Sequence, residues 1–295
     1  MARIAQYRSR AARTAALAAS RFHLLARRRQ PALPGSLTPS VGRLGLGFAG
    51  LFLSFVGALS SPTAPDPALV YAWYCGDAGL QTNNVGQVTN WQNQAASGTP
   101  AARNLDRISG TPLAVVCQTT GGPHSVLRCD GASGVWGSSA KFGMLTSDRT
   151  LVAYCRLSST NNGFLFDGST TSPGLTRAQV RDGWWQVGLQ PGSGGNNADT
   201  NTFATAPGVW SAHVFLFKRL IGGTLVAHIS SAGDDFAYTN ALTSGLGGLI
   251  LGKNVAAGRG LAVDIAEFLV YDRALELAER QEVIDYLATK WGAPT

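Results

Sequence analysis

A short apolar run that leads almost directly into an amphipathic pattern constrains the fold more than any other feature of this sequence. Residues 262–271 carry apolar side chains on both faces, which predicts a buried central strand. From Leu277 onward, apolar residues recur at four-residue spacing, which predicts a helix that Gly292 and Pro294 end. The recurring positions are Val283, Leu287 and Trp291, with Ile284 beside them. Such a helix must pack back onto the sheet that contains the strand.

The chain between Pro67 and this segment consists of short apolar runs separated by Gly, Asn, Ser and Thr. Short strands at even spacing are typical of an all-β sandwich. Residues 209–217 and 224–229 predict the two strands of a hairpin whose turn lies at 220–223. Residues 62–67, which contain three prolines, indicate a linker.

The C-terminal segment resembles the signature of bacterial concanavalin A-like, laminin-G-like lectin and glucanase domains. The shared residues are Ile265, Ala266, Glu267, Tyr271, Asp272, Arg273, Ala274, Leu275, Ala278, Glu279, Arg280, Val283, Tyr286, Leu287, Lys290, Trp291 and Gly292. Segments 72–79, 86–94 and 127–131 are similar to further motifs of the family. Glu276 departs from the pattern, because the family tends to have Ser or Thr at this helix N-cap, and the loss should cost about 1 kcal/mol.

The resemblance implies an all-β fold: a concanavalin A-like/laminin-G-like jelly-roll sandwich with a C-terminal α-helix. It covers about residues 69–292, so we expect one domain at 66–295. We expect residues 1–65 to be a basic leader with a signal peptide or anchor and a linker. This fold carries both lectins and glycosidases, so the fold by itself does not decide the function.

The formal charge of +7 is concentrated in the leader. Residues 1–65 contain nine Arg and no Lys, Asp or Glu, and the remainder carries 15 bases against 17 acids, a net charge of −2. A nucleic-acid-binding domain is expected to be basic, so we expect no nucleic-acid partner.

An uncharged run at 44–59 follows the Arg-rich region. Its 16 residues are short for a membrane span of about 20 and fit the apolar core of a signal peptide, with cleavage after Ser60. We therefore expect a secreted or cell-surface protein. An uncleaved segment that anchors the protein in the membrane, and an organellar transit peptide, are the alternatives.

Four cysteines lie after the leader: Cys75, Cys117, Cys129 and Cys155. In an exported protein they would allow up to two disulfides, with three possible connectivities. The alternative is that Cys75 and Cys129 replace apolar residues of the core. Their spacing is not that of a structural zinc site.

Residues with catalytic chemistry are sparse. Retaining glucanases need two carboxylates about 5 Å apart across the glycosidic bond. The nearest match is Asp264-Ile-Ala-Glu267, which has Ala262 where the first carboxylate should be. We therefore interpret Glu267 as structural and predict no catalytic residue. His213 and His228 are expected to face each other across the hairpin as a cross-strand polar pair.

Sugar rings stack on exposed indoles, so three tryptophans are candidate ligand-binding residues: Trp136, Trp184 and Trp185. Trp184 and Trp185 are adjacent on a predicted strand, so one should lie in the core and the other should be exposed. Trp136 lies in a Gly/Ser-rich stretch that indicates a loop. Asp234 and Asp235 are candidate ligands for Ca²⁺, which is the one cofactor the sequence suggests; a solvated turn is the alternative.

Our leading hypothesis is an exported, non-catalytic binding module that recognises a glycan or a cell-surface or matrix protein, without enzyme activity. One alternative is a structural component of an envelope or surface assembly. Another is a glycan-cleaving enzyme on a concanavalin A-like fold. An exposed Trp in a groove favours the first, a flat apolar patch the second, and two carboxylates about 5 to 9 Å apart in a cleft the third.

Overall fold

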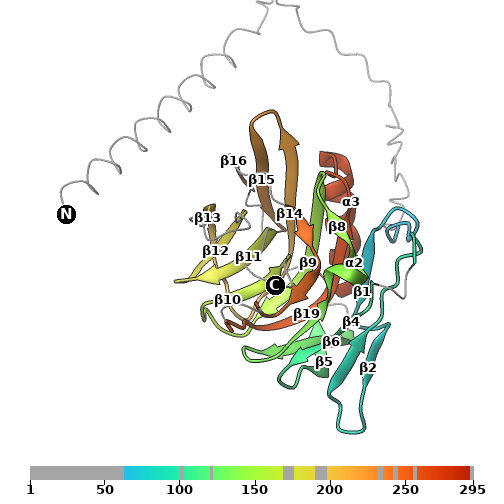
Figure 1. The fold of residues 1–295 in the computed structure, drawn as a ribbon. Coiled ribbons are helices and arrows are strands. Elements are labelled where there is room, and N and C mark those ends of the chain that lie inside the picture. Colours follow the sequence, from blue (N-terminus) through green and yellow to red (C-terminus); the bar gives the residue numbers. More distant parts are fainter. Residues whose placement is uncertain are drawn as a thin grey trace, which may run out of the picture. The chain divides into compact units, whose positions relative to one another are not determined.

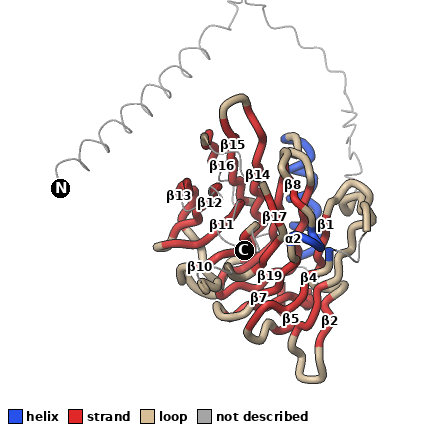
Figure 2. The backbone as a smooth tube through the Cα atoms, in the orientation of Figure 1, coloured by secondary structure: helices blue, strands red, loops and turns tan. Residues whose placement is uncertain are grey.

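A computed structural model describes residues 63–99, 103–119, 122–168, 176–189, 198–231, 235–241, 245–254 and 258–292. The expected signal peptide or anchor, with its cleavage after Ser60, lies outside these residues. The described part is built mainly of antiparallel strands in two large sheets, with one long helix (Figure 1; Figure 2). No helix in these ranges is long and apolar enough to cross a membrane.

Sheet A contains, in spatial order, β16 (Asp235–Asn240), β15 (Gly223–Ser230), β14 (Trp210–Leu220), β9 (Arg149–Leu157), β19 (Ala262–Tyr271), β6 (Gly122–Asp130) and β5 (Leu113–Thr119), and β1 (Ala72–Cys75) also pairs with β19. Sheet B contains β13 (Ala198–Ala204), β12 (Trp184–Leu189), β11 (Thr176–Arg181), β10 (Gly163–Asp167), β18 (Leu249–Leu251), β7 (Gly134–Gly137), β4 (Leu105–Ser109), β3 (Val88–Trp91) and β2 (Leu80–Thr82). The remaining elements are β8 (Met144–Leu145), β17 (Leu246–Gly247), α2 (Ser139–Phe142) and α3 (Leu277–Trp291).

The two sheets enclose the main hydrophobic core. Alternate residues of each strand face it, such as Phe215 and Phe217 of β14 against Trp185 and Val187 of β12. This alternation is the period-two pattern of a strand with one face buried. The predicted fold class, an all-β sandwich of the jelly-roll kind with a C-terminal helix, is therefore confirmed.

A second core lies between the other face of sheet A and α3 (Figure 1). Val283, Leu287 and Trp291 are buried there against residues such as Val152 and Leu269. The predicted arrangement of strand, short connection and packed helix is confirmed, and the helix begins at Leu277 as expected.

The start of α3 compensates for the missing Ser or Thr N-cap. The Glu279 carboxylate accepts a hydrogen bond from the backbone N–H of Glu276, with 2.8 Å between the nitrogen and Oε2. This bond satisfies one of the backbone donors that a helix end leaves open.

The predicted hairpin is also confirmed, because β14 and β15 pair from His213 with Ser230 to Leu220 with Gly223.

Residues 63–67 of the segment we expected to be a linker lie beside α3 and are mostly exposed. Thr63, Pro65 and Asp66 lie along a cavity beside α3.

All four cysteines are buried free thiols, so neither disulfide that export would allow is formed. Cys129 and Cys155 belong to the main core, as small apolar side chains do.

Candidate functional site

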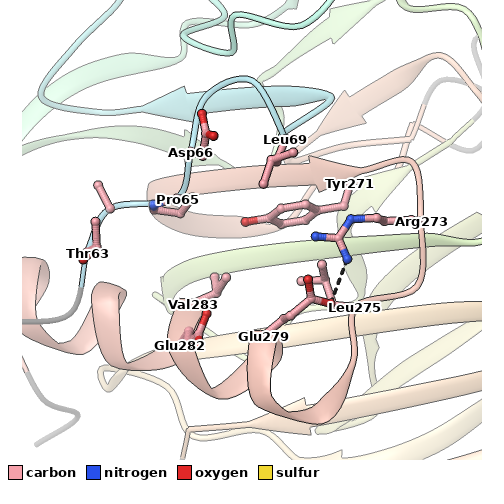
Figure 3. Close-up of a pocket in the computed structure, with 11 residues that line it drawn as sticks. Thr63, Pro65, Asp66, Leu69, Tyr271, Arg273, Leu275, Glu279, Glu282 and Val283 are labelled. Carbon is pink, nitrogen blue, oxygen red and sulfur yellow. Dashed lines mark hydrogen bonds and ion pairs between the residues drawn. The ribbon is translucent and has the colours of Figure 1, made fainter.

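A cavity of about 250 Å³ lies between residues 63–69 and the first turns of α3 (Figure 3). Tyr271, the last residue of β19, lies between these two walls, and Leu69 and Val283 add apolar surface. The cavity exists because β19 leads into α3 through only a few residues, which holds the helix close to the strand end.

Tyr271 is the buried polar group of this cavity. It is 3% exposed, and its hydroxyl has no hydrogen-bond partner within the described ranges. Figure 3 shows the hydroxyl directed into the space between Pro65 and Val283. Burial raises the pKa of the phenol, so the group stays protonated and can donate a hydrogen bond. A buried hydroxyl without a partner is rare in proteins and costs free energy until a ligand or water satisfies it.

An ion pair fixes one end of the cavity. Arg273 Nη1 lies 2.7 Å from Glu279 Oε2, and the guanidinium carbon lies 5.9 Å from the centre of the Tyr271 ring. The hydrogen bond from Arg273 lowers the pKa of Glu279, with a smaller effect from the Glu276 N–H. Glu279 therefore stays ionised and is already engaged by two partners.

Asp66 and Glu282 occupy opposite walls of the same cavity. Asp66 lies on the segment above Tyr271 and Glu282 on the helix below it (Figure 3). Both side chains are exposed, and Asp66 Oδ1 accepts a hydrogen bond from the Ala68 N–H at 2.9 Å. Carboxylates are the residue type that glycosidases use as general acid and as base or nucleophile.

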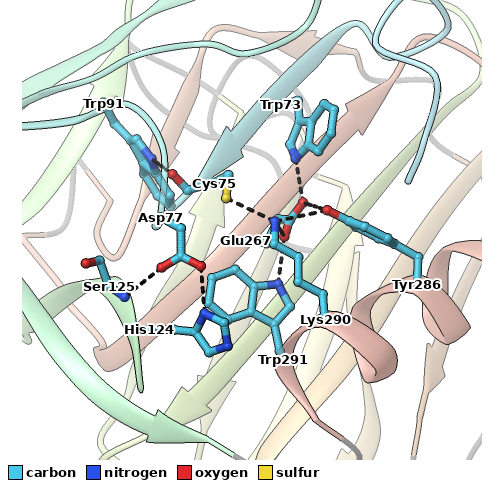
Figure 4. Close-up of polar contacts among 10 residues, drawn as sticks. All are labelled: Trp73, Cys75, Asp77, Trp91, His124, Ser125, Glu267, Tyr286, Lys290 and Trp291. Atoms are coloured by element: carbon cyan, nitrogen blue, oxygen red, sulfur yellow. Dashed lines mark hydrogen bonds and ion pairs between the residues drawn. The ribbon is translucent and has the colours of Figure 1, made fainter. Parts of the chain in front are cut away.

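Glu267, the carboxylate of the glucanase-like motif, is hydrogen-bonded within a separate polar cluster (Figure 4). Its side chain is completely buried. Oε1 accepts from Trp73 Nε1 at 2.5 Å and from the Tyr286 hydroxyl at 3.0 Å. Oε2 accepts from Lys290 Nζ at 2.8 Å and from Trp291 Nε1 at 2.7 Å. Four donors leave no accessible lone pair for a substrate, which agrees with a structural role for Glu267.

Lys290 joins this carboxylate to the neighbouring strand. Burial alone would lower the pKa of Lys290, but the Glu267 carboxylate outweighs it and the pKa is raised. The ammonium also lies 3.1 Å from Cys75 Sγ and 3.0 Å from the Tyr286 oxygen. Trp73 is half-buried and holds β1 to this cluster through its indole N–H.

A second polar group lies at the edge of the same cluster. Gly76 permits it, because a Cβ at this position would lie 2.0 Å from the Ser125 carbonyl oxygen. The close approach brings Asp77 Oδ2 within 2.6 Å of His124 Nδ1, and Asp77 Oδ1 accepts from the Ser125 N–H at 2.8 Å (Figure 4). The His124 ring packs on Trp291 with ring centres 4.6 Å apart.

Asp264, the other carboxylate of the motif, is also a buried structural group. Its oxygens lie 2.6 Å from Arg128 Nε and 2.6 Å from Arg156 Nη2. Burial acts to raise the pKa of Asp264, but the hydrogen bonds from the two arginines outweigh it and the pKa is lowered. Within the described ranges, neither Asp264 nor Glu267 lines the cavity at Tyr271.

The three candidate tryptophans are not brought together. Trp185 is 2% exposed and belongs to the main core, whereas Trp184 is 44% exposed, so the expected division of this pair is found. Trp136 lies in strand β7 rather than in a loop, paired with Asp106 of β4 and Ile250 of β18. The loop prediction was wrong because Gly134 and Gly137 look like loop residues, yet both are buried in sheet B.

We expect Trp184→Ala to change the free energy of unfolding by less than about 0.5 kcal/mol, because an exposed side chain loses few contacts. Trp185→Ala should cost about 3 kcal/mol or more, since it empties part of the core. Urea unfolding of the two variants measures the contrast. Equal losses of stability would contradict the burial described here.

The candidate Ca²⁺ ligands are only partly described. Asp234 lies outside the described residues, and Asp235 is an exposed residue at the start of β16. Within the described ranges, no three His, Cys, Asp or Glu side chains are grouped so that they could hold a metal ion. Ca²⁺ binding by Asp234 and Asp235 stays a prediction.

No protein-family model and no curated protein sequence matches this chain. Solved structures with a similar fold include a GH54 α-L-arabinofuranosidase soaked with 4-nitrophenyl α-L-arabinofuranoside, at a TM-score of 0.53 and 11% identity over 71% of this chain and 52% of that one. A Trypanosoma rangeli sialidase in complex with 2,3-difluorosialic acid matches at a TM-score of 0.51 and 13% identity, over 77% of this chain and 34% of that one. The chain thus spans about a third of the sialidase and about half of the arabinofuranosidase.

The comparison corrects our leading hypothesis. We expected a non-catalytic binding module, but these neighbours are glycan-cleaving enzymes, so the finding favours the glycan-cleaving alternative. At identities of 11% and 13% the likeness itself shows the shared β-sandwich fold alone.

Sequence reasoning missed the residues of that cavity. Tyr271 and Arg273 stand on the C-terminal signature, but nothing in the pattern shows that the tyrosine hydroxyl lacks a partner. Asp66 stands in the proline-rich stretch that we interpreted as a linker, and Glu282 looked like one of several solvated charges on α3. Only the packing of residues 63–69 beside the helix brings them to one place.

Proposed function

We propose that this protein cleaves glycosidic bonds in the cavity at Tyr271, with Asp66 and Glu282 as the pair of acting carboxylates. The observation that carries the proposal is the position of these two carboxylates on opposite walls, with an unpartnered tyrosine hydroxyl between them. We infer that the sandwich is of the concanavalin A-like, laminin-G-like kind that the sequence resembles, and that the protein acts outside the cell on surface glycans.

Each cavity residue has a distinct role in this proposal. One carboxyl group protonates the oxygen of the leaving sugar, while the other attacks the anomeric carbon or activates a water molecule. Tyr271 donates a hydrogen bond to a sugar hydroxyl. The pair of Arg273 and Glu279 holds the helix end in place and does not take part in proton transfer.

The charge of the cavity indicates the class of sugar. The cavity is lined by three carboxylates, those of Asp66, Glu279 and Glu282, and by one guanidinium, that of Arg273. A sugar with its own carboxylate would be repelled by this excess of negative charge. We therefore infer that the substrate is a neutral glycan rather than a sialic-acid-containing one.

Hydrolysis of a panel of 4-nitrophenyl glycosides by the protein tests the proposal. We expect release of 4-nitrophenol from at least one neutral glycoside, and a fall of at least about 100-fold in kcat/KM for Asp66→Asn and for Glu282→Gln. Both residues are exposed, so these variants should fold normally. Tyr271→Phe should lower kcat/KM by about tenfold, the value of one hydrogen bond.

Asp285→Asn is the matched control, because Asp285 is an exposed carboxylate of the same helix whose Oδ1 accepts from Gln281 Nε2 away from the cavity. It should keep the activity of the unaltered protein. The proposal fails if no member of the panel is hydrolysed, or if hydrolysis persists unchanged in Asp66→Asn and Glu282→Gln.

A further inference from the structure

A chain of four polar side chains crosses the space between the sheets at a distance from the Tyr271 cavity. Ser211 Oγ lies 2.7 Å from His213 Nε2, both on β14. His213 Nδ1 lies 3.1 Å from His228 Nε2 on β15, and His228 Nδ1 lies 2.7 Å from Thr202 Oγ1 on β13. The expected facing of His213 and His228 is thus found, but it is part of a longer relay that joins sheet A to sheet B.

The last member of the relay sets its direction. The Thr202 hydroxyl lies 3.3 Å from the backbone carbonyl oxygen of Trp185, which we assign as its acceptor, and this assignment makes the hydroxyl the acceptor of a hydrogen bond from His228 Nδ1. A neutral imidazole has one N–H, so His228 Nε2 is an acceptor and His213 Nδ1 is its donor. His213 Nε2 is then left as the acceptor that faces the Ser211 hydroxyl. This is the tautomer that a general base for a serine requires.

Burial keeps both imidazoles neutral. His213 is 5% exposed and His228 is completely buried. Burial lowers the pKa of His213 to about 4. Burial, with a smaller effect from the neighbouring His213, also lowers the pKa of His228 well below its ordinary value. At neutral pH, His213 is therefore unprotonated.

The serine end of the relay opens into a cavity of about 100 Å³. Ser211 is half-buried and lines this cavity together with His213. The other walls are mainly apolar and include Leu157, Trp185 and Phe203. This volume leaves room for a short acyl chain. An apolar recess beside a hydroxyl paired with imidazole is suited to the acyl part of a small ester.

We propose that Ser211 and His213 form a second reactive site, which hydrolyses esters of short-chain carboxylic acids through an acyl-serine intermediate. The site uses different residues and a different cavity from the proposed glycan cleavage and does not depend on it. His228 and Thr202 are positioning residues, because they fix the tautomer and the ring of His213 without touching the ester.

The reaction has two balanced steps. Ser211 Oγ forms a bond to the ester carbonyl carbon while its proton passes to His213 Nε2; the alcohol then leaves and takes that proton as the ester C–O bond breaks. Water next attacks the acyl-serine, gives one proton to His213 Nε2, and releases the carboxylic acid as Ser211 recovers the proton. The sum is ester plus water to acid plus alcohol.

The test is the reaction of the full-length protein with 4-nitrophenyl acetate, followed by acid quenching and mass spectrometry. We expect one added acetyl group, located on Ser211 by peptide mapping, and a burst of 4-nitrophenol. Ser211→Ala should lose both the acetyl group and the hydrolysis. His213→Gln should lower the rate of acetylation by at least about 100-fold, the usual effect of a general base.

Thr239→Ala is the control, because Thr239 is an exposed hydroxyl residue of β16 that pairs in register with Leu225 and neither lines this cavity nor belongs to the relay. It should be acetylated as the unaltered protein is. Circular dichroism establishes that each variant is folded. Absence of acetylation in the folded unaltered protein, acetylation at any other residue, or hydrolysis by Ser211→Ala within twofold of the unaltered rate would each overturn the proposal.

Discussion

Replacement of Glu267 by alanine should destabilise this protein by about 3 to 5 kcal/mol, the cost of removing one partner from a buried ion pair. The variant leaves Lys290 without its carboxylate. It also removes the acceptor of two indole N–H groups and of the Tyr286 hydroxyl. Each buried donor without a partner adds its own desolvation cost. A loss of this size is a large part of the stability of a typical domain.

Urea unfolding at neutral pH measures this effect. Trp291→Phe is an intermediate variant, because it keeps an aromatic ring against the sheet but removes one donor to Glu267. We expect it to cost less than Glu267→Ala. Glu282→Ala, on the exposed face of α3, serves as the control and should change the free energy of unfolding by less than about 0.5 kcal/mol. An equally small change in the free energy of unfolding for Glu267→Ala would show that Glu267 and its four donors do not hold α3 to sheet A.

The parts of the fold that could be predicted are those in which a local pattern is enough. The apolar stripe of Val283, Leu287 and Trp291 predicts both the helix and its buried face, because its spacing matches the helical repeat. Two adjacent residues on a strand must point to opposite faces, so the contrast between Trp184 and Trp185 also follows from sequence.

The candidate sites could not be predicted in the same way, because their residues come from distant parts of the chain. Ser211 and His213 are two positions apart on one strand, but their relay ends at Thr202 of the opposite sheet. Asp66 and Glu282 are more than 200 positions apart and meet only because α3 folds back beside residues 63–69. No periodic sequence pattern predicts that two such distant residues lie close together. The motif from Asp264 to Glu267 is visible in the sequence, but its carboxylates are buried in ion pairs.

Asp264→Asn should cost about 3 kcal/mol at neutral pH, since the variant removes a completely buried carboxylate from two arginines. Arg128 and Arg156 keep partial contact with water, so the cost should be smaller than that for Glu267→Ala. Asp106→Asn is the matched control, because Asp106 pairs with Lys141 at the surface and the Asp106 and Lys141 side chains are 43% and 49% exposed. An exposed pair of this kind contributes less than about 1 kcal/mol.

The pH dependence of the stability lost in Asp264→Asn tests whether the charge of the carboxylate causes that loss. The two arginines lower the pKa of Asp264 in the folded state below its value of about 3.9 in the unfolded chain. The stabilisation by the carboxylate is therefore fully present above that unfolded value and is lost as the pH falls through the lower folded value. Urea unfolding of the unaltered protein and of Asp264→Asn should show a difference in the free energy of unfolding that is smaller at pH 3 than at pH 7. A difference that is equal at both values would mean that asparagine acts by altered packing rather than by loss of charge.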